Sequence, residues 1–385
     1  MSIATDRPLT LALFCKVVDN YGDIGICWRL ARQLQQEHGI DVTLWVDDLA
    51  SFQRLWPAVR CDLVSQQLAG VTVRHWQDQL GNFAPHEVAD IVIEFFAVDL
   101  PPGYVNAMAA RLPRPHWFNL EGLSAEAWVE GCHKMPSTHP RLPLMKHFFF
   151  PGFNANTGGL MRETSLTERQ ARWCDEALAG SALLARLGVS AHEARATLVS
   201  LFCYPHAPLA DIFAAWQGGA QALTCLVPEG VASEAVAAFL GAPARAGAAR
   251  TAGALCVRVI DFVDQDSYDE LLWRCDLNFV RGEDSFVRAQ WAGKPFVWHI
   301  YPQDEALHHK KLRAFLDCYG ATDPALAALS LCWNGADTCV DWATLWQGFA
   351  QAMPALRQHA TRWDGAMQAH GDLAANLLAF AAALK

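Results

Sequence analysis

The chain has 385 residues, which is too long for one comfortable hydrophobic core, so we expect two domains. Its formal net charge of −10 argues against nucleic acid or an anionic membrane surface as the main partner. A hydrophobic content of 52% with 18% charged residues is typical of a folded globular protein and excludes a disordered chain.

Twelve cysteines occur along the chain, and none of them forms a Cys-x-x-Cys pair. The zinc and thioredoxin signatures are therefore missing, and the spacing of histidines such as His299, His308 and His309 matches no zinc pattern. No signal peptide and no apolar run of membrane-spanning length is evident in the sequence. We therefore expect a cytoplasmic protein that binds no metal and no membrane.

Acidic residues mark the first predicted turn. Residues 9–17 form an apolar run that predicts a buried strand, and residues 26–38 have the spacing of an amphipathic helix. Between them, Asp19 and Asp23 lie four residues apart in a segment with two glycines. Loops at the carboxyl ends of strands bind ligands in open α/β sheets. Because Asp is also a common helix cap, a structural and a functional interpretation of this pair both stay open.

The rest of the first half alternates strand and helix signals, which indicates a parallel sheet with helices on its faces. Residues 130–165 differ, since their prolines and weak periodicity predict a long irregular segment. The predicted strands are 41–46, 71–75, 90–95 and 115–119, with a helix at 103–111.

A second strand and helix series follows a helical stretch at 166–189 and predicts another α/β domain. We place the domain boundary near residue 180, and the last helix, 373–384, can return to the first domain. The predicted strands of this half are 196–202, 222–227, 256–260, 277–280 and 295–299.

A second glycine turn follows the strand 277–280 and leads into a helical stretch at 286–292. The backbone N–H groups of a first helical turn attract anions, and Arg281 adds a fixed cation, so the turn suits a diphosphate. A plainly capped helix is the alternative interpretation, because Asp284 or Ser285 can cap.

Aromatic and polar residues stand at the ends of neighbouring strands in the same half. Side chains of these types could sandwich a nucleotide base and hold a ribose. They are Phe202, Tyr204, Phe262, Gln265 and Tyr301.

Long motifs run through the whole chain: DNYGDIGICWRL (19–30), NLE (119–121), WVEGCH (128–133), HPRLPL (139–144), FFFPGF (148–153), TGGL (157–160) and RGEDSFVRAQWAG (281–293). In these motifs the chain resembles the EarP family, bacterial protein-arginine rhamnosyltransferases that modify translation elongation factor P. Gly122 departs from the family pattern, which has a bulkier residue after NLE.

The resemblance implies an α/β protein with the GT-B glycosyltransferase fold, in which two Rossmann-like domains face a central cleft. Residues 1–178 would bind the acceptor, with the helix 366–385 packing back on them, and residues 179–365 would bind the nucleotide sugar. The implied reaction moves rhamnose from dTDP-β-L-rhamnose to an arginine side chain of elongation factor P, with inversion and with neither a metal nor a cofactor.

By motif position, Asp19 and Asp23 take the catalytic places. The implied donor-binding residues are Tyr21, Gly22, Phe202, Tyr204, Phe262, Gln265, Arg281, Glu283, Asp284, Ser285 and Tyr301.

The acceptor sets a chemical problem, because an arginine guanidinium stays protonated at neutral pH. Its free deprotonation would cost roughly 7 kcal/mol. We assign the role of base to Asp23 and the orienting role to Asp19, since one carboxylate can bind the guanidinium while the other accepts a proton. A GT-B transferase with another acceptor, and a non-catalytic nucleotide-sugar-binding adaptor, remain alternatives.

Overall fold

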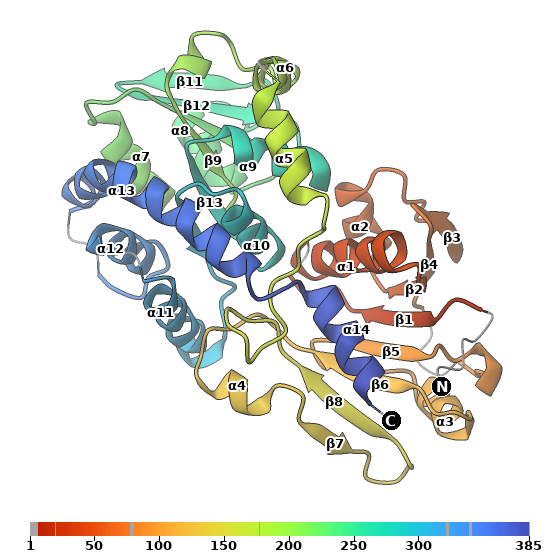
Figure 1. Cartoon of the computed structure of the whole chain (residues 1–385). Coiled ribbons are helices and arrows are strands. Elements are labelled where there is room, and N and C mark those ends of the chain that lie inside the picture. Colours follow the sequence, from red (N-terminus) through yellow and green to blue (C-terminus); the bar gives the residue numbers. More distant parts are fainter. Residues whose placement is uncertain are drawn as a thin grey trace. The chain divides into compact units, whose positions relative to one another are not determined.

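A computed structural model describes residues 7–19, 21–77, 81–176, 178–320, 323–338 and 341–384. Clustering of the backbone divides the chain into two compact units (Figure 1). Unit 1 comprises Met1–Thr164 and Met367–Lys385, and unit 2 comprises Ser165–Ala366.

Unit 1 is built on a sheet with the strand order β3-β4-β2-β1-β5-β6-β8-β7, in which the edge strands β3 and β7 are antiparallel and the others parallel. The strands are β1 Thr10–Cys15, β2 Asp41–Val46, β3 Ser65–Leu68, β4 Val71–His75, β5 Ile91–Phe95, β6 His116–Leu120, β7 Pro136–Thr138 and β8 Met145–Phe149. The helices are α1 Gly22–His38, α2 Leu49–Leu55, α3 Pro102–Ala110, α4 Trp128–Cys132 and α14 Leu373–Ala383, with a 3₁₀ turn, η1, at Pro85–Glu87.

The predicted strands of the first half are all present, but the irregular segment predicted at 130–165 is wrong in part. It contains α4 and the hairpin of β7 and β8, and β8 extends the parallel sheet next to β6. The sequence pattern does not reveal this hairpin, because β7 spans only three residues and begins with Pro136.

The last helix, α14, belongs to unit 1. The amide of Gln33 in α1 donates to Asp372 Oδ1, the N-cap of α14, at 3.0 Å. Asn376 Nδ2 donates to the carbonyl oxygen of Gly158 at 3.0 Å. These bonds join the C-terminal residues to the first half of the sequence.

Unit 2 contains a second sheet, with the strand order β11-β12-β10-β9-β13-β14, in which only the β11 pairing is antiparallel among the described strands. Its strands are β9 Thr197–Leu201, β10 Leu223–Pro228, β11 Ala249–Ala252, β12 Leu255–Ile260, β13 Leu277–Arg281 and β14 Phe296–His299. Its helices are α5 Leu166–Asp175, α6 Ala179–Arg186, α7 Leu209–Gln217, α8 Ser233–Leu240, α9 Gln265–Arg274, α10 Asp284–Trp291, α11 Leu307–Tyr319, α12 Pro324–Trp333 and α13 Trp342–Gln368, the last of which continues into unit 1; the 3₁₀ turns are η2 Glu193–Arg195 and η3 Asp304–Ala306.

The structure divides the chain after Thr164, whereas the sequence analysis placed the boundary after residue 178. The difference is helix α5, which packs in unit 2. Trp173 of α5 lies 5.8 Å from Trp273 of α9, between ring centroids. Trp173 also packs on a buried cluster that includes Leu183 and Leu271.

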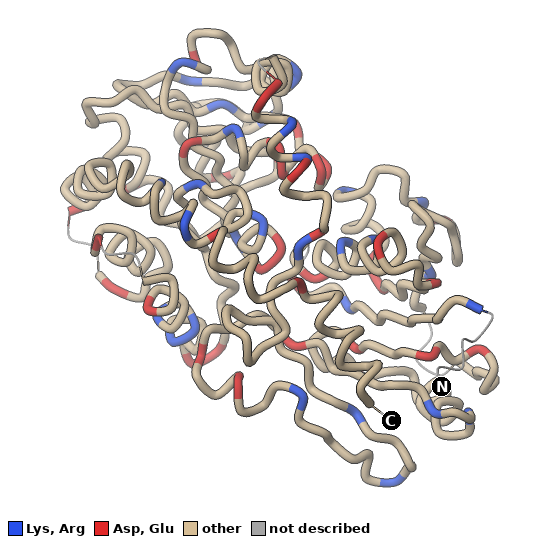
Figure 2. Tube along the Cα trace, in the orientation of Figure 1, with Lys and Arg blue, Asp and Glu red and all other residues tan. Residues whose placement is uncertain are grey.

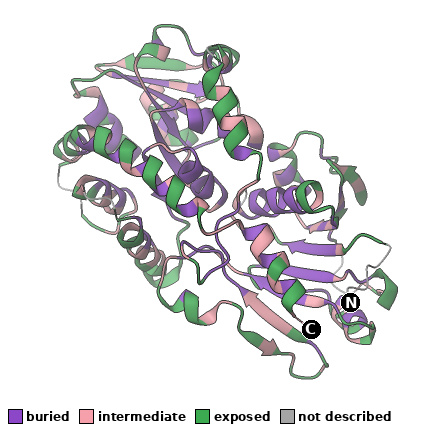
Figure 3. Ribbon diagram, viewed as in Figure 1, coloured by how far each residue is buried: buried purple, intermediate pink, exposed green. Residues whose placement is uncertain are grey.

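In each unit the central strands form the buried interior, the edge strands β3, β7 and β11 are largely exposed, and the helices expose their outer faces (Figure 3). Acidic and basic residues are interspersed along the described chain (Figure 2). Within the described ranges no helix is both long and apolar enough to cross a membrane.

A buried ion pair holds α10 against α9. Arg288 donates from Nε to Asp269 Oδ1 at 3.0 Å and from Nη2 to Asp269 Oδ2 at 2.6 Å, and both side chains are 1% exposed. Two parallel bonds of this kind fix the orientation as well as the distance of the two helices. Gln290 of α10 accepts a further bond, from Trp363 Nε1 at 2.8 Å.

Replacing Arg288 tests this anchor. We expect Arg288→Ala to lower the free energy of unfolding by about 3 kcal/mol, because Asp269 would remain as a buried charge without this partner. Urea denaturation followed by tryptophan fluorescence measures the change. Arg313→Ala is the matched control, since its pair with Asp337 is about half exposed and should contribute less than about 1 kcal/mol. Equal losses in the two variants would contradict the proposed anchor.

Candidate active site

The turn between β1 and α1 is closed by the side chain of Asp23. This residue lies in the first turn of α1 and is 4% exposed. Its Oδ2 accepts the backbone N–H groups of Val18 at 2.7 Å and of Asp19 at 2.8 Å. The carboxylate therefore folds the chain back on the end of β1 and is itself held in place.

Burial raises the pKa of the Asp23 carboxyl, and the nearby Asp47 carboxylate raises it further, although the two backbone N–H groups oppose the shift. A carboxylate with a raised pKa is a stronger base, so this position favours proton uptake during a reaction. The same shift affects stability. The contribution of Asp23 to stability is complete below its unfolded pKa and is lost as the pH rises through its higher folded pKa.

Asp19 is half-buried at the other end of the turn. The backbone N–H of Gly22 donates to the carbonyl oxygen of Asp19 at 2.7 Å. A Cβ atom at position 22 would lie 2.8 Å from Asp19 Oδ2, so only glycine leaves the Asp19 side chain where it is. The turn thus brings the two predicted catalytic residues together. Tyr21 is the N-cap of α1; Asn20 of the same motif lies outside the described residues.

The turn after β13 in unit 2 is closed in a related way. Ser285 Oγ accepts the backbone N–H of Arg281 at 3.2 Å and donates to the Arg281 carbonyl oxygen. Gly282 has a φ of +63°, a conformation that favours glycine. Trp298 Nε1 donates to the Gly282 carbonyl oxygen at 2.7 Å, which ties the turn to β14.

Arg281 contacts two aromatic rings. Its guanidinium carbon is 4.6 Å from the centroid of Phe202 and 4.8 Å from that of Tyr204, both within cation–π range. Nη1 also donates to the carbonyl oxygen of Cys203 at 3.4 Å. Both rings were predicted to contact a nucleotide base, and in this structure they contact the arginine.

The remaining candidates of unit 2 surround this stack. Tyr301 lies 5.8 Å from Tyr204 and Phe262 lies 6.4 Å from Phe202, between ring centroids. Gln265 Nε2 donates to Asp284 Oδ2 at 3.3 Å, and Glu283 is the N-cap of α10. The structure therefore collects all the candidates of the second half around one turn.

Sequence reasoning missed one member of this cluster. His206 stacks on Tyr204 at 5.8 Å between ring centroids, with the planes at 6°. Its neighbour His299 was considered only as a metal ligand. Within the described ranges, no group of three or more His, Cys, Asp or Glu residues could hold a metal ion.

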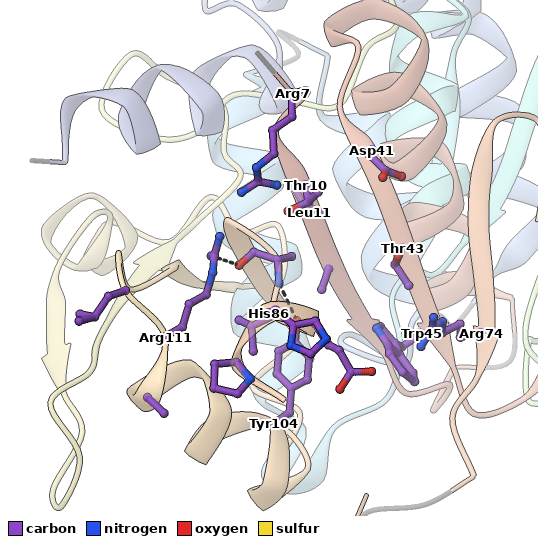
Figure 4. A pocket seen from close by; sticks show the side chains of 17 residues that line it. Arg7, Thr10, Leu11, Asp41, Thr43, Trp45, Arg74, His86, Tyr104 and Arg111 are labelled. Atoms are coloured by element: carbon purple, nitrogen blue, oxygen red, sulfur yellow. Dashed lines mark hydrogen bonds between the residues drawn. The ribbon is translucent and has the colours of Figure 1, made fainter. Parts of the chain in front are cut away.

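A separate cavity of about 750 Å³ in unit 1 is lined by residues of β1, β2, η1 and α3 (Figure 4). Arg7 and Arg111 of its lining both pair with Asp90. Burial alone would raise the pKa of Asp90, but hydrogen bonds from Thr10 and Arg111 lower it to about 2. Arg74 lies over Trp45 at 5.1 Å. None of the candidate site residues lines this cavity.

Comparison with known proteins decides the family. A family model described as elongation factor P (EF-P) rhamnosyltransferase EarP matches residues 11–382. The chain belongs to the EarP family. The protein-arginine rhamnosyltransferase of Pseudomonas putida strain KT2440 is 49% identical over 374 residues, which cover 96% of this chain and 98% of that protein.

Comparison with solved structures supports the assignment of the chain to the EarP family. One that describes the structural basis of EarP-mediated arginine glycosylation of EF-P has 35% sequence identity and a TM-score of 0.67, and the match covers 98% of this chain and 100% of that one. The spinosyn rhamnosyltransferase SpnG, at 12% identity and a TM-score of 0.50, shares the fold alone; that match covers 97% and 100% of the two chains. The predicted α/β class and GT-B glycosyltransferase fold are confirmed.

Proposed function

We propose that this chain, a glycosyltransferase of the EarP family, transfers rhamnose from dTDP-β-L-rhamnose to an arginine side chain of elongation factor P, with inversion at the anomeric carbon. The observation that carries the proposal is the family match over residues 11–382, which includes both turns described above. Since the acceptor belongs to the translation machinery, we place the reaction in the cytoplasm.

The turn of unit 1 supplies what an arginine nucleophile requires. In the proposed reaction a guanidinium nitrogen attacks the anomeric carbon, the bond from that carbon to the diphosphate oxygen breaks, and the nitrogen loses a proton. Asp23 accepts this proton, because its buried carboxylate is held by two backbone N–H groups and has a raised pKa. Asp19, which is more exposed, binds the guanidinium and orients it.

The turn of unit 2 supplies what a diphosphate leaving group requires. Arg281 is a permanent cation that contacts two aromatic rings, and the N-terminus of α10 adds backbone N–H groups. Negative charge on the departing dTDP grows as the bond breaks, so fixed donors stabilise it. Glu283 and Asp284 carry carboxylates, which suit the hydroxyl groups of a sugar rather than a phosphate. Tyr21 and Gly22 of unit 1 remain predicted donor contacts.

Replacing Asp23 tests the base. We expect Asp23→Asn to abolish transfer, because its amide oxygen can still accept both N–H groups but the side chain cannot take a proton. The melting temperature should stay within about 4 °C of the wild type, the shift caused by a change of about 1 kcal/mol. Incubation with dTDP-rhamnose and elongation factor P, followed by intact mass, shows whether one deoxyhexose is gained.

Asp48→Asn is the control for this variant. Asp48 caps α2 by accepting from Ala50 N at 2.9 Å, an interaction that asparagine retains, so transfer should continue. Wild-type protein that adds no deoxyhexose would contradict the proposed function. Transfer by Asp23→Asn at the wild-type rate would contradict only the assignment of the base.

Replacing Arg281 tests the diphosphate site. Arg281→Lys keeps the charge but loses the planar guanidinium that contacts both rings, so we expect dTDP to bind roughly tenfold more weakly, and Arg281→Ala to bind it more weakly still. Isothermal titration with dTDP measures this. Arg313→Lys, on the exposed surface of α11, serves as the control and should bind dTDP as the wild type does. Wild-type affinity in Arg281→Lys would remove Arg281 from the site.

A further inference from the structure

Two histidines lie directly behind Tyr204 in unit 2. His299 is the last residue of β14 and is 1% exposed. Its Nδ1 accepts the backbone N–H of Tyr204 at 3.2 Å. Its Nε2 lies 3.1 Å from Nε2 of His206, which is exposed. The interactions form a chain from the end of β9 through a buried imidazole to the surface.

The hydrogen bonds fix where the protons are. A backbone N–H can only donate, so Nδ1 of His299 carries no proton and its ring proton sits on Nε2. That proton points at His206 Nε2, which must therefore accept it and carry its own proton on Nδ1. Each imidazole is neutral in this arrangement, and neither can rotate without losing a bond.

The two imidazoles also pack against the Tyr204 ring. His206 stacks on one face, and the ring of His299 meets it edge-on at 5.1 Å and 74°. Tyr204 in turn contacts the guanidinium of Arg281. Arg281 is also directly opposite His299 in the β13–β14 pairing, so the two residues occupy neighbouring positions on adjacent strands.

The charges around His299 agree with a neutral ring. Burial holds the pKa of His299 well below the usual range, and the Arg281 guanidinium and the neighbouring His206 and His308 act in the same direction by disfavouring a second proton on the ring. Trp333 packs on it at 5.7 Å. A proton on Nδ1 would remove the acceptor for Tyr204 and add positive charge beside Arg281.

We propose that His299 is a positioning residue of the donor site, because its Nδ1 fixes Tyr204 and thereby the Arg281 guanidinium that receives a nucleoside diphosphate. His206 acts behind it by selecting the tautomer that leaves Nδ1 able to accept. This inference rests on the proposed function, since it assumes that dTDP binds at Arg281.

Two substitutions of similar polarity distinguish a positioning role of the His299 side chain from a role in general packing. In His299→Asn the amide oxygen can occupy the place of Nδ1 and accept from Tyr204, whereas in His299→Gln the amide group reaches only the place of Nε2. We expect dTDP affinity within about threefold of the wild type for His299→Asn and roughly tenfold weaker for His299→Gln. The KM for the nucleotide sugar should rise in His299→Gln, while kcat at saturating donor changes little.

Equal affinity of the two variants for dTDP, whether both are weakened or both match the wild type, would overturn the inference. Circular dichroism confirms that both are folded before titration. Wild-type protein that binds no dTDP would contradict the proposed donor and this inference together. Normal dTDP binding without transfer would contradict the proposed reaction and leave the comparison of the two variants valid.

Discussion

A buried carboxylate that accepts two backbone N–H groups is the interaction on which the acceptor half of this account depends. Asp23 closes the turn between β1 and α1, so the residue assigned to accept a proton is also the residue that shapes the site. The two roles act in opposite directions on its ionisation. The N–H groups stabilise the charged form, whereas burial and Asp47 disfavour it, and burial is the larger effect. A buried carboxylate of this kind lowers the stability of the folded protein at neutral pH, and it is a stronger base than an exposed one.

The proposed donor site in unit 2 is also built on a turn between a strand and a helix, but a different side chain closes this turn. A hydroxyl, from Ser285, closes the turn after β13, and the charge is presented by Arg281 instead. The guanidinium is fixed by the rings of Phe202 and Tyr204, and Tyr204 is fixed by a neutral histidine pair. Positional precision thus comes from side chains that add no further charge next to the proposed diphosphate. In both units a strand, a glycine turn and a helix place the functional group at the carboxyl end of the sheet.

Much of this was predictable from local patterns. The apolar runs before Asp19 and Arg281 identified β1 and β13, and the glycines identified the turns, because these signals are local in sequence. The hairpin of β7 and β8 was missed, since its stability comes from pairing with β6 rather than from its own sequence. The boundary at Thr164 depends on where α5 packs, which periodicity does not reveal. The contacts of Arg281 with Phe202 and Tyr204, and the contact between His206 and His299, join residues far apart in sequence, so only the fold could show them.

Whether Asp23 can act as the base is tested most directly by measuring the pKa of its carboxyl group in the folded protein. Isotope-labelled aspartate followed by NMR across a pH series gives this value, and the spectrum of Asp23→Asn identifies the signal. We expect a pKa above the ordinary Asp value of about 3.9, because burial outweighs the two N–H groups. A pKa at or below that value would show that the hydrogen bonds dominate. Asp23 would then be a structural cap, and the assignment of the base would fail.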